Sequence, residues 1–158
     1  MTSPPGKSHR FAQVAEEFCR LVETLPRQDP QEWLGQIAAV LHPIEEAAED
    51  LVPEVEGGAY PMLADLEKRH QMFLQLKSFL GPIDDYWSEF DLEAGDGLMT
   101  GSIADDVTEI YFALKRGLDL WPLDEEHALR EWVTSYEDHW RRHLVNLMAQ
   151  AKVKVRYH

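Results

Sequence analysis

Two histidines near the C-terminus, His139 and His143, have the side-chain type and spacing to bind a metal ion. They stand four residues apart in a segment with helical periodicity, so both rings are expected on one helix face, one turn apart. That spacing suits two imidazole ligands on one divalent metal ion. Trp140 and Arg141 follow the first histidine, so the glutamate that serves as general base in His-Glu-x-x-His enzymes is absent.

Further metal ligands would have to come from another helix, and two consecutive aspartates are the candidates. Asp105 and Asp106 open the predicted helix that precedes the histidine helix, whereas His143 lies near the end of the latter. These positions come to the same end of the molecule if the two C-terminal helices pack antiparallel. The resulting hypothesis is a divalent metal site formed by His139, His143, Asp105 and Asp106.

The same four residues also have a structural interpretation, which we favour from the sequence alone. Aspartate carboxylates can hold histidine rings by hydrogen bonds and so lock two helices together without any chemistry. An aspartate at a helix start also accepts hydrogen bonds from exposed backbone N–H groups and interacts favourably with the helix dipole. Ionisable clusters occur in functional sites and in structural networks alike, so both interpretations stay open.

Three other pairs of metal-binding residue types share helix faces, but chance explains such spacings in a chain so rich in acids. Paired carboxylates hold magnesium in all-helical nucleotide pyrophosphatases, because this cation prefers oxygen ligands. A Glu-x-x-His pair is typical of di-iron bundles, which need the pair on two helices and further glutamates on two others. The carboxylate pairs are Glu46 with Glu49 and Asp106 with Glu109, and the Glu-x-x-His pair is Glu67 with His70.

Charge excludes some classes of partner. The 158 residues include 15 Lys and Arg against 29 Asp and Glu, a formal net charge of −14. A phosphate backbone or an anionic membrane surface would be repelled, so we expect neither nucleic acid nor membrane as a partner. Cations and basic protein surfaces suit this charge better, and solubility explains it as well.

Cysteine content and hydropathy indicate the compartment. Cys19 is the only cysteine, so no disulfide can form within the chain. The N-terminus lacks the apolar run of a signal peptide. No stretch approaches the ~20 apolar residues of a membrane span. A cytoplasmic protein is expected.

Apolar residues recur at intervals of three and four residues along the sequence. This pattern predicts an all-α fold, a single-domain antiparallel helical bundle of about five helices. Residues 1–7 are expected to be a flexible leader and residues 8–150 the bundle domain. Residues 151–158 form a basic tail, either a short strand or disordered. Pro43 should kink or end its helix. Residues expected to cap helix starts are Ser8, Asp29, Ser102 and Asp124.

Between two of these helices, residues 83–101 are the least regular part of the chain. Tyr86, Trp87 and Phe90 lie there among acidic residues, and glycines follow. We expect a long loop with a helical turn at its start. The aromatic side chains would serve either as a docking surface or as a lid folded onto the bundle, and the lid is favoured.

Two sequence motifs, within residues 102–118 and 135–143, resemble those of a bacterial family known as domain of unknown function 5063. Arg141 departs from the family pattern, which commonly has glycine there, and so argues against a close backbone approach at that point. The resemblance implies a helical fold and marks Tyr111 and Trp140 as binding residues, without supplying a reaction. The positions that match are Ser102, Ala104, Asp105, Asp106, Tyr111, His139, Trp140 and His143.

The leading functional hypothesis is a non-catalytic protein-interaction module whose partner is another protein, because no catalytic set is recognisable. The alternative is a metal-binding protein or metal-dependent hydrolase that uses the His/Asp cluster. The alternative requires the four side chains to converge in a cleft open to solvent. The interaction hypothesis requires an exposed apolar or acidic face. Enzymatic activity and oligomeric state are left open.

Overall fold

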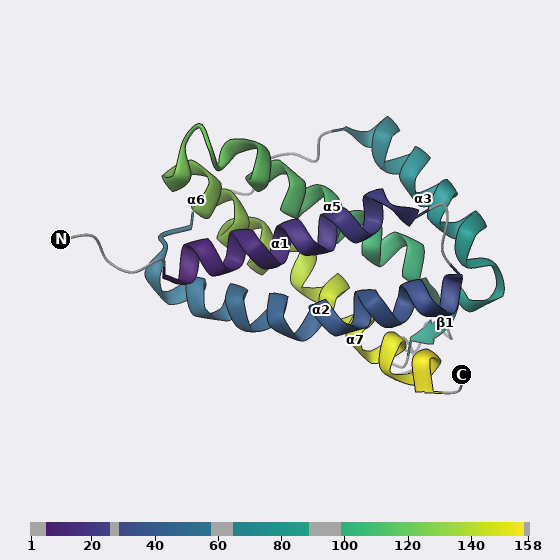
Figure 1. The fold of residues 1–158 in the computed structure, drawn as a ribbon. Coiled ribbons are helices and arrows are strands. Elements are labelled where there is room, and N and C mark those ends of the chain that lie inside the picture. Colours follow the sequence, from purple (N-terminus) through teal and green to yellow (C-terminus); the bar gives the residue numbers. More distant parts are fainter. Residues whose placement is uncertain (1–5, 26–28, 58–64, 89–98, 157–158) are drawn as a thin grey trace.

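The computed structural model describes residues 6–25, 29–57, 65–88 and 99–156 (Figure 1). Helix α6, a π-helical turn and α7 run on as one continuous helix, which leaves five long helices in the described residues. The predicted all-α bundle of about five helices is confirmed. The helices are α1 (Lys7–Glu23), α2 (Pro30–Leu51), α3 (Leu66–Leu80), α5 (Ile103–Leu120), α6 (Glu125–Ser135), the π turn (Tyr136–Trp140) and α7 (Arg141–Arg156).

Short elements lie between the helices of the described residues. Two 3-10 turns, η2 (Val52–Glu54) and η3 (Gly81–Ile83), follow α2 and α3. Two four-residue strands, β1 (Asp85–Ser88) and β2 (Met99–Ser102), pair antiparallel. None of the described helices is both long and apolar enough to cross a membrane.

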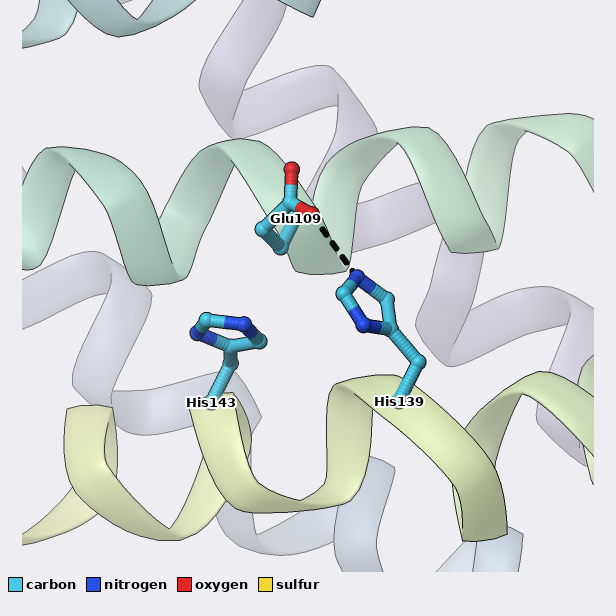
Figure 2. A group of neighbouring side chains, drawn as sticks. All are labelled: Glu109, His139 and His143. Atoms are coloured by element: carbon cyan, nitrogen blue, oxygen red, sulfur yellow. Dashed lines mark hydrogen bonds and ion pairs between the residues drawn. The ribbon is translucent and has the colours of Figure 1, made fainter. Parts of the chain in front are cut away.

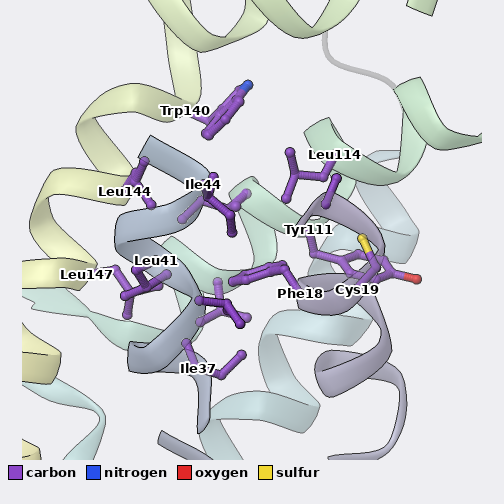
Figure 3. Packing of buried hydrophobic residues seen from close by; sticks show 14 of the residues in the cluster. Phe18, Cys19, Ile37, Leu41, Ile44, Tyr111, Leu114, Trp140, Leu144 and Leu147 are labelled. Carbon is purple, nitrogen blue, oxygen red and sulfur yellow. The ribbon is translucent and has the colours of Figure 1, made fainter. Parts of the chain in front are cut away.

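The core lies where α1, α2, α5 and α7 meet, as Figure 3 shows. The predicted stripe of α1 places Phe11 and Phe18 inward, whereas Val14 and Leu21 pack at its edge. Burial of each large apolar side chain contributes roughly 1.5–3 kcal/mol. Other core side chains that are almost fully buried are Ile37, Leu41, Ile44, Leu114, Trp140, Leu144 and Leu147.

Three of the four predicted helix caps are confirmed. The carboxylate of Asp29 accepts from the N–H groups of Gln31 and Glu32. In the same way Asp124 accepts from the His127 N–H, and the Ser102 hydroxyl accepts from the Asp105 N–H. The Ser8 prediction is wrong, because α1 already begins at Lys7, after Gly6. Lys7 therefore belongs to the bundle, and residues 1–5 of the expected leader lie outside the described residues.

Of the two effects expected of Pro43, a kink or an end of the helix, the second is wrong, because α2 continues to Leu51. An internal proline costs a helix about 3 kcal/mol through its lost hydrogen bond and its ring clash. Beyond it, Ile44, Ala47 and Leu51 are all buried in the core. Packing of the second half of α2 therefore offsets the local cost.

The tail prediction is also wrong for residues 151–156, which continue α7 as helix. Ala151 is buried and extends the apolar seam of this helix. The Lys154 ammonium donates to the backbone carbonyls of Ile83 and Asp85, which ties the helix end to the body. Residues 157–158 lie outside the described residues.

The loop prediction is wrong for residues 85–88 and 99–101, which lie in the paired strands, with Asp85 opposite Ser102 and Ser88 opposite Met99. Four-residue strands are too short to show an alternating pattern in the sequence. The helical turn expected at its start lies just before it, because η3 ends at Ile83 and β1 begins at Asp85. Residues 89–98 and the side chains of Tyr86 and Trp87 lie outside what the structure describes, so neither predicted role of the aromatic residues is tested.

Gly117 of α5 lies directly against the Trp132 side chain of α6. A Cβ atom there would lie 2.0 Å from Nε1 of Trp132, an indole that donates to the Leu114 carbonyl. We expect Gly117→Ala to lower the free energy of unfolding by about 2 kcal/mol, measured by urea denaturation, because the indole must shift.

The matched control is Gly35→Ala in α2, where an added Cβ would meet no atom within 4 Å. Alanine favours helix over glycine by roughly 0.5–1 kcal/mol, so this variant should gain stability. Equal effects of the two substitutions would contradict the close packing of Trp132 on α5.

Candidate functional site

Helix α5 faces the π turn and α7 with a row of acidic side chains. Asp105, Asp106 and Glu109 lie on neighbouring positions of the first turns of α5. Figure 2 shows Glu109 directed from α5 toward the rings of His139 and His143. The two rings lie edge to face, with centroids 5.2 Å apart. The predicted antiparallel meeting of the two C-terminal helices therefore occurs.

His143 contacts both predicted aspartates. Its Nδ1 lies 2.8 Å from Oδ1 of Asp106 and 3.8 Å from Oδ2 of Asp105. Asp106 is almost completely buried, whereas 55% of the Asp105 side chain is exposed. A buried carboxylate favours the tautomer with hydrogen on Nδ1, which leaves the lone pair on Nε2 for another ligand.

His139 pairs with Glu109, a carboxylate that was not among those proposed for it. Its Nε2 lies 2.7 Å from Oε1 of Glu109, whose other oxygen accepts from Arg69 of α3 at 2.9 Å. Glu109 was considered from the sequence only as a partner of Asp106. Its position four residues after Asp105 is the signal that places it on the same helix face.

A π-helical turn sets the orientation of His139. The Arg141 N–H donates to the Tyr136 carbonyl, five residues back. Buried residues recur here at strict intervals of four, and each such step drifts by about 40° around an ideal α-helix. The wider turn absorbs that drift and keeps one seam against the core. The residues of this run are Ala128, Trp132, Tyr136, Trp140 and Leu144.

The carboxyl groups of the site differ in acidity. Burial raises the pKa of Glu109, but the hydrogen bond from His139 and the charge of Arg69 bring the net pKa below its usual value. Partial burial raises the pKa of Asp105, and the nearby Glu109 adds to this effect while His143 opposes it. Glu109 is therefore held as a carboxylate, the form that binds metal ions.

The start of α5 is fixed by a residue that the sequence did not single out. Asp84 is 1% exposed, and its carboxylate accepts from the Ala104 N–H at 2.6 Å and the Ser102 hydroxyl at 2.8 Å. Lys77 of α3 pairs with it at 3.0 Å. These bonds hold the turn that carries the site aspartates. Because they join residues about 20 positions apart, no local pattern reveals them.

Of the two residues marked for binding by the resemblance, one is inaccessible. Trp140 is fully buried, and its indole donates to the Ser135 hydroxyl. Tyr111 is 8% exposed, donates to the Glu23 carboxylate at 2.7 Å and lines a cavity beside α3. Trp140 therefore has no surface to offer a ligand.

Two overlapping groups in the described residues have the composition of a metal site. Glu109, His139 and His143 form one, and Asp105, Asp106 and His143 form the other. Within each group the donor atoms lie within 4.8 Å of one another. Neither group contains Glu67 or His70, which are both exposed on α3. The structure thus replaces the predicted four-residue cluster by two triads that share His143.

The charge on Glu109 predicts a specific response to acid. Because the pKa of Glu109 is lowered in the folded protein, its contribution to stability is present above the ordinary value of 4.5 and is lost as pH falls below it. We expect Glu109→Gln to destabilise the protein by about 1–2 kcal/mol at pH 7. Urea denaturation between pH 3 and pH 7 should show a shallower acid loss than in the parent protein.

The control for this comparison is Glu126→Gln, which alters an 86% exposed carboxylate paired with Arg130. Surface pairs of this kind contribute little, so stability and its pH dependence should stay unchanged. If the parent protein and Glu109→Gln lose stability in parallel, the carboxylate is not the source of the acid response.

Comparison with known proteins finds likeness in fold and family. The crystal structure of a protein from Bacteroides fragilis matches 90% of this chain and 88% of its own, with a TM-score of 0.71 and 21% sequence identity. At that identity the match shows the fold alone. No curated protein matches the chain significantly. Because a family model matches residues 3–158, the protein belongs to the family described as Domain of unknown function (DUF5063).

Proposed function

We propose that the protein binds one divalent transition-metal ion through Glu109, His139 and His143. The observation that supports this is the convergence of two imidazoles and a carboxylate from α5, the π turn and α7 (Figure 2). Two nitrogens and one oxygen suit zinc or ferrous iron. Three protein ligands leave a coordination position for water, which is the arrangement of hydrolytic metal sites.

The role of Asp106 is to orient His143. Metal-binding histidines usually donate their other ring N–H to a carboxylate or carbonyl, which fixes the tautomer and the ring direction. The 2.8 Å contact between Asp106 and Nδ1 of His143 is of this kind. Nε2 is then the nitrogen that would coordinate.

The metal ion would enter between the side chains of His139 and Glu109. Donor atoms of a tetrahedral zinc site lie about 3.3 Å apart, given bond lengths of 2.0–2.1 Å. The present separation is 2.7 Å, so an opening of about half an ångström is enough. Because the ion replaces a shared proton, acid should weaken metal binding.

Two features favour a ligand site over a contact that only holds the helices together. The π turn is a helix distortion that occurs often at functional sites, and it carries one of the ligands. The formal charge of −14 also attracts cations. Arg69 acts in the opposite direction, but it contacts Oε2 of Glu109, whereas His139 contacts Oε1.

Calorimetric zinc titration of tag-free protein tests the proposal. We expect one zinc per chain, and at least 100-fold weaker binding after combined His139→Gln and His143→Gln substitution, because two of three ligands are lost. Asp106→Asn should weaken binding about 10–100-fold through the misoriented ring. His127→Gln, which alters a half-exposed histidine outside both triads, should have no effect.

Failure of the parent protein to bind zinc, ferrous iron or manganese would sink the metal proposal. The same holds if the double variant binds as tightly as the parent. In either case the histidine pairs would be packing contacts between α5 and α7, and circular dichroism would then show a loss of stability as the main effect of the substitutions.

A second candidate is the protein-interaction module, which one observation supports. Leu66 and Leu74 on α3 are 65% and 50% exposed. Leu74 borders a largely apolar cavity of about 760 Å³ between α3 and the end of α1, lined also by Val22, Leu25 and Phe79. An apolar groove of this kind suits an amphipathic helix of a partner protein.

Site-specific photo-crosslinking in living cells tests the interaction candidate. A crosslinking residue at Leu74 should trap one defined partner protein, whereas one at Val145, which is 44% exposed on α7, should not. Equal adducts at both positions, or none at Leu74, would rule out this face as the interaction surface.

A further inference from the structure

A second cavity, separate from the proposed metal site, lies between α3, α5 and the start of α6. Its volume is about 560 Å³, within the range of small-molecule sites. Lys68 and Met72 line it from α3, and Phe112 and Lys115 line it from α5. None of the five residues of the two metal-type triads contributes to its wall, so it is a distinct place on the molecule.

The charge of this cavity departs from that of the chain. Its wall holds three basic residues, Lys68, Lys115 and Arg116, against two acidic ones, Asp65 and Asp119, which gives 3 − 2 = +1. The whole chain carries −14. His127 also lines the cavity and would add positive charge when protonated. In a strongly acidic molecule, this wall is a place where an anion meets less repulsion.

The cations of the wall are able to bind an incoming anion. Lys115 pairs with Glu23 and Arg116 with Glu131, each at 3.2 Å, and the two basic side chains are 40% and 47% exposed. The Lys115–Glu23 pair is exposed on both sides and contributes only about 0–1 kcal/mol, so exchanging it for a ligand costs little. Lys68 is exposed and takes part in no ion pair within the described residues.

An apolar surface lies beside these cations. Met72, Phe112 and Leu120 are partly buried and line the same cavity. The ring of Tyr111 stands edge-on to that of Phe112, with centroids 5.3 Å apart, and stiffens this part of the wall. A ligand that satisfies both surfaces has an apolar, preferably aromatic, body and one anionic group.

We propose that this cavity binds a small anion with an apolar body, its carboxylate or phosphate group held by Lys68 and Lys115. The proposal does not depend on metal binding. The two sites are nevertheless neighbours, because Phe112 follows Glu109 by one helical turn. The Arg69 guanidinium contacts Glu109 and lies 5.1 Å from the centre of the Phe112 ring.

Matched aromatic probes test the proposal by isothermal titration calorimetry. 2-Naphthoate and 1-naphthyl phosphate carry the anion, whereas 2-naphthalenemethanol keeps the body without the charge. We expect at least one of the two anions to bind ten-fold or more tightly than the alcohol. Lys68→Glu should weaken binding of that anion about ten-fold, which corresponds to about 1.4 kcal/mol, and should leave the alcohol unaffected.

Two control variants separate the possible outcomes. Lys152→Glu makes the same charge change at an exposed position of α7 outside the cavity and should leave anion binding intact. The combined His139→Gln and His143→Gln variant should also retain it, which distinguishes this cavity from the metal site. The proposal is overturned if neither anion binds, if the alcohol binds equally well, or if Lys68→Glu and Lys152→Glu have the same effect.

Discussion

The register between α5 and the continuous helix α6–α7 determines where each candidate metal-binding side chain lies. Trp132 fixes it at one end, because its indole donates to the Leu114 carbonyl and fills the space left by Gly117. Asp84 fixes the other end of α5 through the Ala104 N–H and the Ser102 hydroxyl. A slip of either helix by one residue would separate the histidines from their carboxylates.

Within that register the polar side chains of the site are largely buried and form hydrogen bonds and ion pairs with one another. Glu109 contacts His139 and Arg69, while His143 contacts Asp106. Buried carboxylates and imidazoles are costly unless they are paired, so these contacts must form together with the helix packing. The same contacts hold two rings and a carboxylate ready for a cation. Stability and metal binding therefore depend on the same side chains.

The sequence predicted the helices and part of the site, for identifiable reasons. Periodic apolar stripes and polar caps are local signals, and residues such as Phe18, Asp29 and Ser102 behave as those signals indicate. The meeting of His143 with Asp105 and Asp106 followed from the antiparallel geometry of two adjacent helices. Both inferences needed only short-range patterns and one packing rule.

Features that depend on contacts between residues distant in the sequence could not be predicted from local sequence patterns. Asp84 acts across a segment of about 20 residues, and α2 passes Pro43 because the core beyond it outweighs a local penalty. His139, which pairs with Glu109, lies in the π turn. That turn was readable in principle, since the run of apolar residues from Ala128 to Leu144 keeps intervals of four where an ideal α-helix would drift.

The most direct test of metal binding is an anomalous difference map, collected at the zinc edge from crystals grown with zinc. We expect one peak between α5 and α7, about 2.0–2.2 Å from a carboxylate oxygen of Glu109 and a ring nitrogen of each histidine. A map without a peak there, with His139 still bonded to Glu109 and His143 to Asp106, would show that these residues hold the helices together and bind no metal.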